Sequence, residues 1–147
     1  RGLVGSEMCI RDSFITFFFA LHDPARGAID YVNCGHNPPL FVPDKGPGMF
    51  LGAGCPGLGM LDALPVVGVG TLDARPGSTL VCFTDGLVEQ ENEAGQDFGE
   101  HRLQRLVESD RKAGAEAMNA AIIVEWERHR GTADPADDTA LLTTRFS

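Results

Sequence analysis

The sequence predicts an α+β domain with an antiparallel sheet, because strand-like segments come first and helix-like segments follow. Up to residue 84 the apolar segments are short, rich in β-branched and aromatic residues, and bounded by glycine and proline. Apolar residues at helical spacing occur only after Phe98. This order lacks the β-α-β alternation that is typical of a parallel sheet. With no repeat or linker in the sequence, we expect one domain.

Residues 1–13 are expected to be a leader that does not belong to the domain. They do not begin with methionine, they continue no periodicity of the later sequence, and they resemble translated sequencing-adapter material. They also lack the apolar core of a signal peptide. We therefore expect the domain to span residues 14–147, and Leu3, Val4 and Ile10 to pack little against it.

The first strands are expected at residues 14–21 and 28–33. The run 14–21 is almost wholly apolar, which predicts a strand buried on both faces. Turn-forming residues at 22–27, including an Asp-Pro pair and a glycine, favour a hairpin between the two strands. Shorter strands separated by glycine and proline are expected at 40–42, 49–51 and 64–72, and residues 52–59 are expected to be irregular.

Gly35-His36-Asn37-Pro38-Pro39 lies between two of these strands. Taken alone, it is best interpreted as a rigid turn with a hydrogen-bonded histidine. An imidazole beside a metal-bound phosphate would instead stabilise leaving-group charge or orient water, and both interpretations stay open. If the second holds, His36 should lie within about 15 Å of Asp85, the reach of a water-bridged network.

The strand at residues 79–84 ends on Asp85 and Gly86. Its apolar, β-branched composition predicts burial, and a Pro-Gly turn pair precedes it. An Asp-Gly pair is a common hairpin turn, so these residues alone leave a turn and a ligand site equally open.

A second acidic pair, Asp137-Asp138, directly precedes a strand-like run at residues 139–145. If that run is antiparallel to the strand ending at Asp85, the acids reach the same edge of the sheet. Clustered carboxylates repel each other unless a cation lies between them, and Mg²⁺, Mn²⁺ and Ca²⁺ prefer oxygen ligands. The pattern favours a metal site, and a Ca²⁺-stabilised domain without catalysis is one alternative.

Two amphipathic helices are expected in the last third of the sequence. One should end near Asp110 and the other at Gly131, which is suited to a helix C-terminus. Their apolar residues at helical spacing are Leu103, Leu106 and Val107, then Ala115, Met118, Ile122 and Trp126. Among the polar residues we expect Glu89 and Glu91 to be solvated charges at a helix start, and His22, His101 and His129 to lie at the surface.

Composition excludes several classes of partner. A formal net charge of -9 leaves no basic stripe for nucleic acid or for an anionic membrane surface. The longest apolar run is shorter than the roughly 20 residues that span a bilayer, so no membrane contact is expected from this segment. The four cysteines form no C-x-x-C pair, which argues against a zinc site and fits a reducing cytoplasm. The oligomeric state is open, with a homodimer among the alternatives.

The order of several short motifs resembles the SpoIIE/RsbU branch of the metal-dependent (PPM, 2C-type) protein serine/threonine phosphatases. The segments that carry the resemblance are 14–21, 31–40, 56–59, 75–77, 83–89, 98–99, 102–103 and 137–142. The resemblance implies a PPM-type αββα fold, in which helices flank an antiparallel β-sandwich. It also implies two Mn²⁺ or Mg²⁺ ions that activate water for attack on a phosphomonoester.

When the family's site residues are matched to this sequence by position, the resemblance implies that Asp85 and Asp137 are metal ligands. It also implies that Gly86 allows a close approach of the backbone. Asp138 is the second acid of the same motif, and His36 and Asn37 are site neighbours. The family's Gly-Gly-Asp-x-x-Asp and Asp-x-x-Gly-His-Gly segments do not occur in the sequence. The chain is therefore expected to be the C-terminal part of a phosphatase domain, with the N-terminal part of the fold missing.

The resemblance implies that the intact protein dephosphorylates serine or threonine in bacterial signalling, on an anti-anti-sigma-type regulator. The 147-residue chain alone is expected to be inactive. A pseudophosphatase that serves as an interaction module is the rival from another functional class.

Overall fold

The computed structural model describes residues 14–63 and 65–147, and these fall into two compact units. Of the described residues, unit 1 holds 14–36, 51–63 and 65–73, and unit 2 holds Asn37–Phe50 and Ala74–Ser147. The chain therefore passes from unit 1 to unit 2, back, and again to unit 2. The expectations for Leu3, Val4 and Ile10 fall outside the described residues.

Unit 1 is a small sheet built around β2 (Ala28–Cys34). One edge of β2 pairs antiparallel with β1 (Phe17–Asp23), as the predicted hairpin requires. The other edge is shared by β5 (Gly54–Cys55), which is parallel, and β6 (Gly70–Asp73), which is antiparallel. The short β5 lies in the glycine-rich stretch that was expected to be irregular.

The strand expected to be buried on both faces is exposed. β1 pairs only with β2 among the described strands, and Phe17, Phe19 and Leu21 are 36%, 58% and 60% exposed. These three residues alternate along the strand and so share one face. An apolar run is equally typical of a central strand and of an edge strand with an apolar outer face, and composition alone does not separate them.

The prediction of a strand over residues 64–72 is also largely wrong. Residues 65–69 have no regular structure, and the strand begins only at Gly70. Val66 and Val69 are 96% and 64% exposed. The Gly68 N–H donates to the carbonyl of Gly54 in β5 at 3.0 Å. Residues 65–69 nevertheless enter no strand register among the described residues, and propensity alone does not form a strand.

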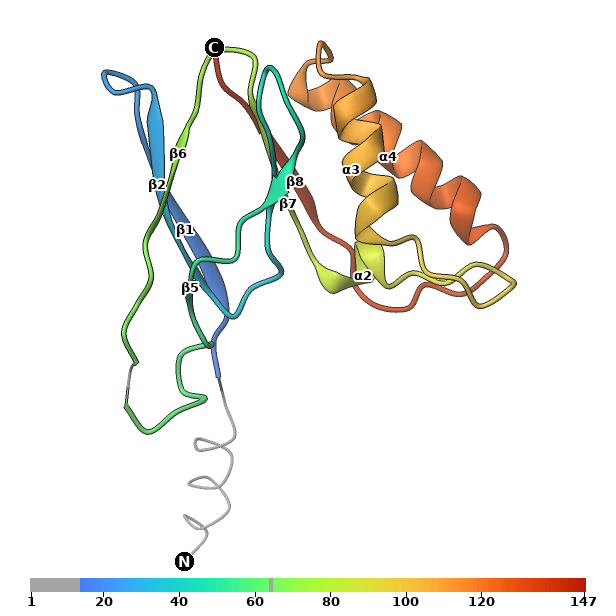
Figure 1. Cartoon of the computed structure of the whole chain (residues 1–147). Helices are drawn as coiled ribbons and strands as arrows, with labels where there is room; N and C mark the ends of the chain where they lie inside the picture. The colour runs from blue at the N-terminus through green and yellow to red at the C-terminus, as the bar shows by residue number, and fades with distance from the viewer. Residues whose placement is uncertain (1–13, 64) are drawn as a thin grey trace, which may run out of the picture. The chain divides into compact units, whose positions relative to one another are not determined.

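Unit 2 combines an antiparallel sheet with helices, which confirms the α+β class. Its strands lie in the order β4 (Met49–Phe50), β3 (Leu40–Val42), β7 (Thr79–Phe83) and β8 (Leu141–Arg145). Its helices are α2 (Asp85–Val88), α3 (Glu100–Ser109) and α4 (Ala115–Arg130). Figure 1 shows α3 and α4 packed side by side along this unit. Within residues 14–63 and 65–147 no helix is long and apolar enough to cross a bilayer.

The core of unit 2 forms where the predicted helical stripes meet alternate residues of the strands. Its fully buried members from the strands are Leu40, Val42, Val81 and Phe83, and from the helices Leu87, Leu103, Val107, Met118 and Ile122. Gly131 ends α4 with a φ of 59°, in the left-handed region where a glycine has no Cβ penalty.

His129 was expected at the surface and is buried. Its ring packs edge-on against Phe98, with centroids 5.6 Å apart, and Nε2 donates to the carbonyl of Gln96 at 2.8 Å. The guanidinium of Arg102 donates to Nδ1. A histidine in the last turn of a helix looks polar in sequence, but here that turn packs against the loop that leads to α3.

Glu108 of α3 stabilises the β3–β4 turn through a hydrogen bond. Its Oε1 accepts from the backbone N–H of Gly48 at 2.6 Å and from the Gln104 amide at 2.9 Å. Arg111 secures the same turn by donating to the carbonyls of Pro43 and Gly46, each at 2.6 Å. The Gly48 N–H, then the Gln104 amide and the Arg111 charge, lower the pKa of Glu108 below its ordinary value of 4.5.

We expect Glu108→Ala to lower the free energy of unfolding at neutral pH by about 1 kcal/mol, a discounted value because the carboxylate is partly solvated. Because the pKa of Glu108 is lower in the folded chain, this stabilisation is fully present at pH values above its ordinary pKa. It is lost as the pH falls through the pKa of the folded state. The difference in unfolding free energy between Glu108→Ala and the unsubstituted chain should therefore shrink below pH 4.5, as measured by urea unfolding. Glu127→Ala, at an exposed position of α4, is the control, and an equal loss in both variants would contradict the role of the turn contact.

Candidate functional site

The candidate acids lie where β7 ends and β8 begins. Asp85 is the first residue of α2 and is separated from the end of β7 by Thr84 alone, and Asp137 and Asp138 lie in the loop before β8. All three side chains are exposed. The predicted antiparallel pairing of the two strands is confirmed, with Phe83 opposite Leu141.

Hydrogen bonds continue this pairing beyond the ends of the strands. The backbone N–H of Thr84 donates to the carbonyl of Ala140 at 3.1 Å. The Thr84 hydroxyl donates to the carbonyl of Asp138 at 3.1 Å and accepts from the N–H of Ala140 at 2.9 Å. Thr84 therefore binds the backbone on both sides of Thr139 and fixes the acidic loop against the start of α2.

Gly86 packs directly against the backbone of the acidic pair. A Cβ placed on this buried glycine would lie 2.6 Å from the carbonyl oxygen of Asp138 and 3.0 Å from that of Asp137. Real Cβ atoms essentially never approach another atom as closely as 2.6 Å. The approach of the loop to Asp85 therefore depends on the absence of a side chain at the next residue.

Gln90 is a positioning residue that sequence reasoning missed. Its side chain is almost fully buried, and Nε2 donates to the carbonyls of Glu91 and Asp134 at 2.9 and 3.0 Å. Its Oε1 accepts from the N–H of Ala136 at 3.0 Å. One amide thereby anchors the segment that precedes Asp137. A glutamine in a polar stretch gives no sequence signal for such a role.

Glu89 and Glu91 are exposed, as expected, but neither of them begins a helix. α2 is a single turn that ends at Val88, Glu89 is its C-terminal cap, and Glu91 forms an isolated bridge with Asp97. The Asp-Gly pair opens a short helix and not a hairpin.

The site fits a hard divalent cation in the type of its ligands but not in their number. Carboxylates and backbone carbonyls are the oxygen donors that Mn²⁺ and Mg²⁺ prefer. However, among residues 14–63 and 65–147 no three side chains of His, Cys, Asp or Glu are grouped closely enough to hold an ion. Asp137 also directs Oδ1 to the N–H of Asp138 at 2.7 Å. Water or further protein ligands would have to complete any coordination shell.

His36 and Asn37 lie at the point where the chain leaves unit 1, with His36 the last residue of that segment and Asn37 the first of unit 2. The His36 N–H donates to Oδ1 of Asn33 at 2.8 Å, and Nδ2 of Asn33 donates to the carbonyl of Leu51 at 3.1 Å. Asn33 thus fixes the backbone of His36. The expected nearness of His36 to Asp85 joins residues of different units and stays a prediction.

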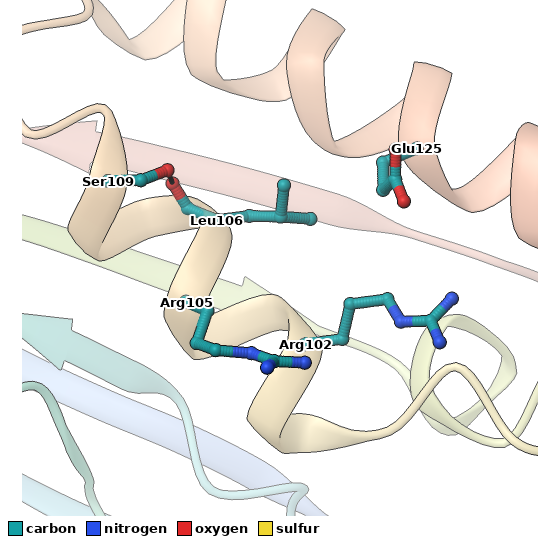
Figure 2. A pocket seen from close by; sticks show the side chains of 5 residues that line it. All are labelled: Arg102, Arg105, Leu106, Ser109 and Glu125. Carbon is teal, nitrogen blue, oxygen red and sulfur yellow. Dashed lines mark hydrogen bonds between the residues drawn. The ribbon is translucent and has the colours of Figure 1, made fainter.

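A separate groove of about 500 Å³ lies between α3 and α4. Figure 2 shows Arg102 and Arg105 projecting from α3 and Glu125 from α4 along this groove. The Arg102 guanidinium binds His129 and lies 5.5 Å from the centre of the Phe98 ring. Arg102 therefore links α4 to the loop that precedes α3. The residues that line the groove include none from the acidic loops.

Comparison with known proteins identifies the family. A family model described as Stage II sporulation protein E (SpoIIE) matches residues 5–147. The chain belongs to the SpoIIE family. This match confirms the family resemblance from which the candidate site residues were assigned. The matched range begins inside residues 1–13, so the boundary expected at residue 14 stays a prediction.

Solved structures show the same fold at low sequence identity. The SiaA-PP2C domain of Pseudomonas aeruginosa superposes with a TM-score of 0.79 and 18% identity, over 99% of this chain and 59% of that one. The phosphatase domain of SpoIIE from Bacillus subtilis gives 0.66 and 16%, over 88% and 56%. The fold of this SpoIIE-family chain is thus that of PP2C-type phosphatase domains, of which it spans a little more than half.

A curated relative is Protein IcfG from Synechocystis sp. It is 27% identical over 106 residues, which cover 72% of this chain and 17% of IcfG. The chain therefore corresponds to a small part of that protein.

Proposed function

We propose that the chain forms the C-terminal part of a metal-dependent protein serine/threonine phosphatase that hydrolyses phosphomonoesters. The observation that supports this most is the contact of Gly86 with the Asp137-Asp138 backbone in a chain of PP2C-type fold. It brings two acidic loops, far apart in sequence, to one edge of a sheet.

In this proposal each residue has a defined part. Asp85 and Asp137 bind Mn²⁺ or Mg²⁺ through carboxylate oxygens, and Asp138 adds negative charge to the site. Thr84, Gly86 and Gln90 position these acids. His36 and Asn37 orient the phosphate or its leaving group. When bound, the cations would supply an acidified water as the nucleophile toward phosphorus.

The substrate we propose is a phosphorylated anti-anti-sigma-type regulator in the bacterial cytoplasm. The family supports bacterial signalling as the setting, because SpoIIE, SiaA and an RsbU domain are among the proteins that share the family or the fold. The exposed acids leave the edge of unit 2 open to a phosphoprotein. A homodimer is compatible with the proposal, which requires no nucleic acid and no membrane.

A second candidate is a pseudophosphatase that acts as an interaction module. It is favoured by the small number of acidic ligands among the described residues, which include no group of three. The two candidates differ in whether the intact protein turns over a phosphomonoester.

The test is hydrolysis of p-nitrophenyl phosphate and of a phosphorylated regulator by the intact parent protein, with Mn²⁺ and with chelator. We expect Mn²⁺-dependent turnover that chelator abolishes. The 147-residue chain alone should give none, because Asp85 and Asp137 leave most positions of an octahedral ion to water. A parent that binds its regulator without turnover would favour the pseudophosphatase, and a chain active alone would show that the missing acids are dispensable.

A further inference from the structure

Two thiols lie next to each other in unit 1. Cys34 ends β2, Cys55 ends β5, and the two residues are partners in the register of these parallel strands. Their sulfur atoms are 3.3 Å apart. Cys34 is 3% exposed, whereas Cys55 is only partly buried and so is accessible to a small reagent.

The backbone around this pair is closely fixed. The N–H of Asn33 donates to the carbonyl of Ala53 at 2.8 Å, just before the two cysteines. Just after them, a Cβ on Gly35 would lie 2.6 Å from the amide nitrogen of Gly57, so the two chains touch there as well. The thiols are thus held as neighbours from both sides and cannot easily separate.

The spacing suits a covalent bond. Neighbouring strands lie about 4.8 Å apart, which falls within the Cα separation of roughly 4.4–6.8 Å found in disulfides. The sulfur atoms must close from 3.3 Å to about 2.0 Å, a change that side-chain rotation can supply.

We propose that Cys34 and Cys55 form a reversible oxidation site, which a peroxide converts into an intramolecular disulfide. The proposal concerns thiol chemistry in unit 1 and does not depend on phosphatase activity.

The two thiols have different parts in the reaction. Burial, followed by the neighbouring Cys55 thiol, raises the pKa of Cys34 above its ordinary value, so Cys34 is the poorer first nucleophile. The Cys55 thiolate attacks one oxygen of hydrogen peroxide, the O–O bond breaks, and a sulfenic acid and hydroxide form. The Cys34 sulfur then loses its proton and attacks Cys55 Sγ, the S–O bond breaks, and a second hydroxide leaves. Both hydroxides take up the thiol protons, so two thiols and one peroxide give one disulfide and two waters.

The bond would join the point where the chain leaves unit 1 to the point where it returns. His36 follows Cys34 by two residues, and Leu51 precedes Cys55 on the way back. The closed loop therefore contains His36, Asn37 and the whole of β3 and β4. Oxidation would restrict the backbone that carries His36, and reduction would release it.

Cys82 offers a matched control. It lies in β7 of unit 2, and burial raises the pKa of its thiol. Cys9 lies outside the described residues. A specific reaction should spare Cys82, whereas random oxidation would consume it together with Cys55.

The experiment treats the full 147-residue chain with one equivalent of hydrogen peroxide, alkylates the remaining thiols and maps the peptides without reduction. Trypsin places Cys34 in residues 27–45 and Cys55 with Cys82 in residues 46–102, because the bond before Pro76 resists cleavage. Fragment sequencing then assigns the linked cysteine. We expect the Cys34–Cys55 link to exceed any other pairing by roughly tenfold or more, since fixed neighbours react at high effective concentration.

Variants and a denatured sample complete the test. Cys34→Ser and Cys55→Ser should abolish the link, Cys82→Ser should keep it, and dithiothreitol should restore both thiols. In urea the unsubstituted chain should no longer form the Cys34–Cys55 link in preference to other pairs. This result would show that the folded structure, and not the intrinsic reactivity of the thiols, causes the selectivity, even if a variant fails to fold. A dominant link to Cys82 or Cys9, or overoxidation of Cys55 with Cys34 still alkylated, would overturn the proposal.

Discussion

The Asp85→Asn substitution in the intact parent is expected to lower Mn²⁺-dependent phosphomonoester hydrolysis by a factor of roughly 10³, the scale of losing one preorganised electrostatic group. Asparagine keeps the shape of the side chain but removes the negative charge that binds the cation. Asp85 is exposed, and its loss leaves the hydrogen bonds of Thr84 and the contact of Gly86 in place. The fold should therefore survive while activity is lost.

The measurement is a pair of assays on the same preparation. Turnover is followed against Mn²⁺ concentration, and stability is followed by thermal unfolding. Asp110→Asn, at an exposed position after α3, is the matched control and should retain full turnover. If Asp85→Asn hydrolysed substrate like the parent with an unchanged dependence on Mn²⁺, Asp85 would have no part in metal binding.

The Gly86→Ala substitution is expected to have the largest effect on structure. The new Cβ would lie 2.6 Å from the carbonyl oxygen of Asp138, and a backbone atom cannot move aside as the end of a side chain can. The start of α2 or the acidic loop must shift, at a cost in unfolding free energy of about 1–3 kcal/mol, the usual range for overpacking. Because the shift separates Asp137 from Asp85, activity of the parent should fall with stability.

Gly114→Ala provides the control. A Cβ on Gly114 meets no atom within 4 Å. Urea unfolding of the two variants should show a clear loss for Gly86→Ala and little change for Gly114→Ala. Equal stability of the two would mean that the acidic loop adapts to residue 86 and that its position is not fixed by this contact.

The sequence predicted the elements that carry a periodic apolar pattern. The helical stripes of α3 and α4 and the glycine at the end of α4 were placed within a few residues of their observed bounds. The same holds for β2, β3 and β7, most of whose apolar residues are buried. Periodicity succeeds in these elements because each has a partner to cover its apolar face.

The errors fall where the outcome depends on a partner that sequence does not show. Residues 65–69 have the composition of a strand but contact β5 through one backbone hydrogen bond, from Gly68 to Gly54. β1 is apolar but lies exposed at an edge. His129 and Gln90 are polar residues buried through hydrogen bonds to distant backbone groups. The acidic residues were predicted from their positions beside strands, and a close backbone approach at Gly86 was implied by the family resemblance. That Gly86 contacts the backbone of Asp137 and Asp138 required the tertiary structure.

The order of strands in unit 2 has a consequence for how the protein folds during synthesis. Leu40 pairs with Val81, and Val81 pairs in turn with Thr143. The β1–β2 hairpin needs only local pairing and can form early, but the sheet of unit 2 cannot be completed before Leu141–Arg145 leaves the ribosome. Until then the apolar residues of β3 and β7 lack a complete sheet. We therefore expect slow folding and a nascent chain that depends on chaperones, and moving β8 ahead of β3 by circular permutation should shorten that interval.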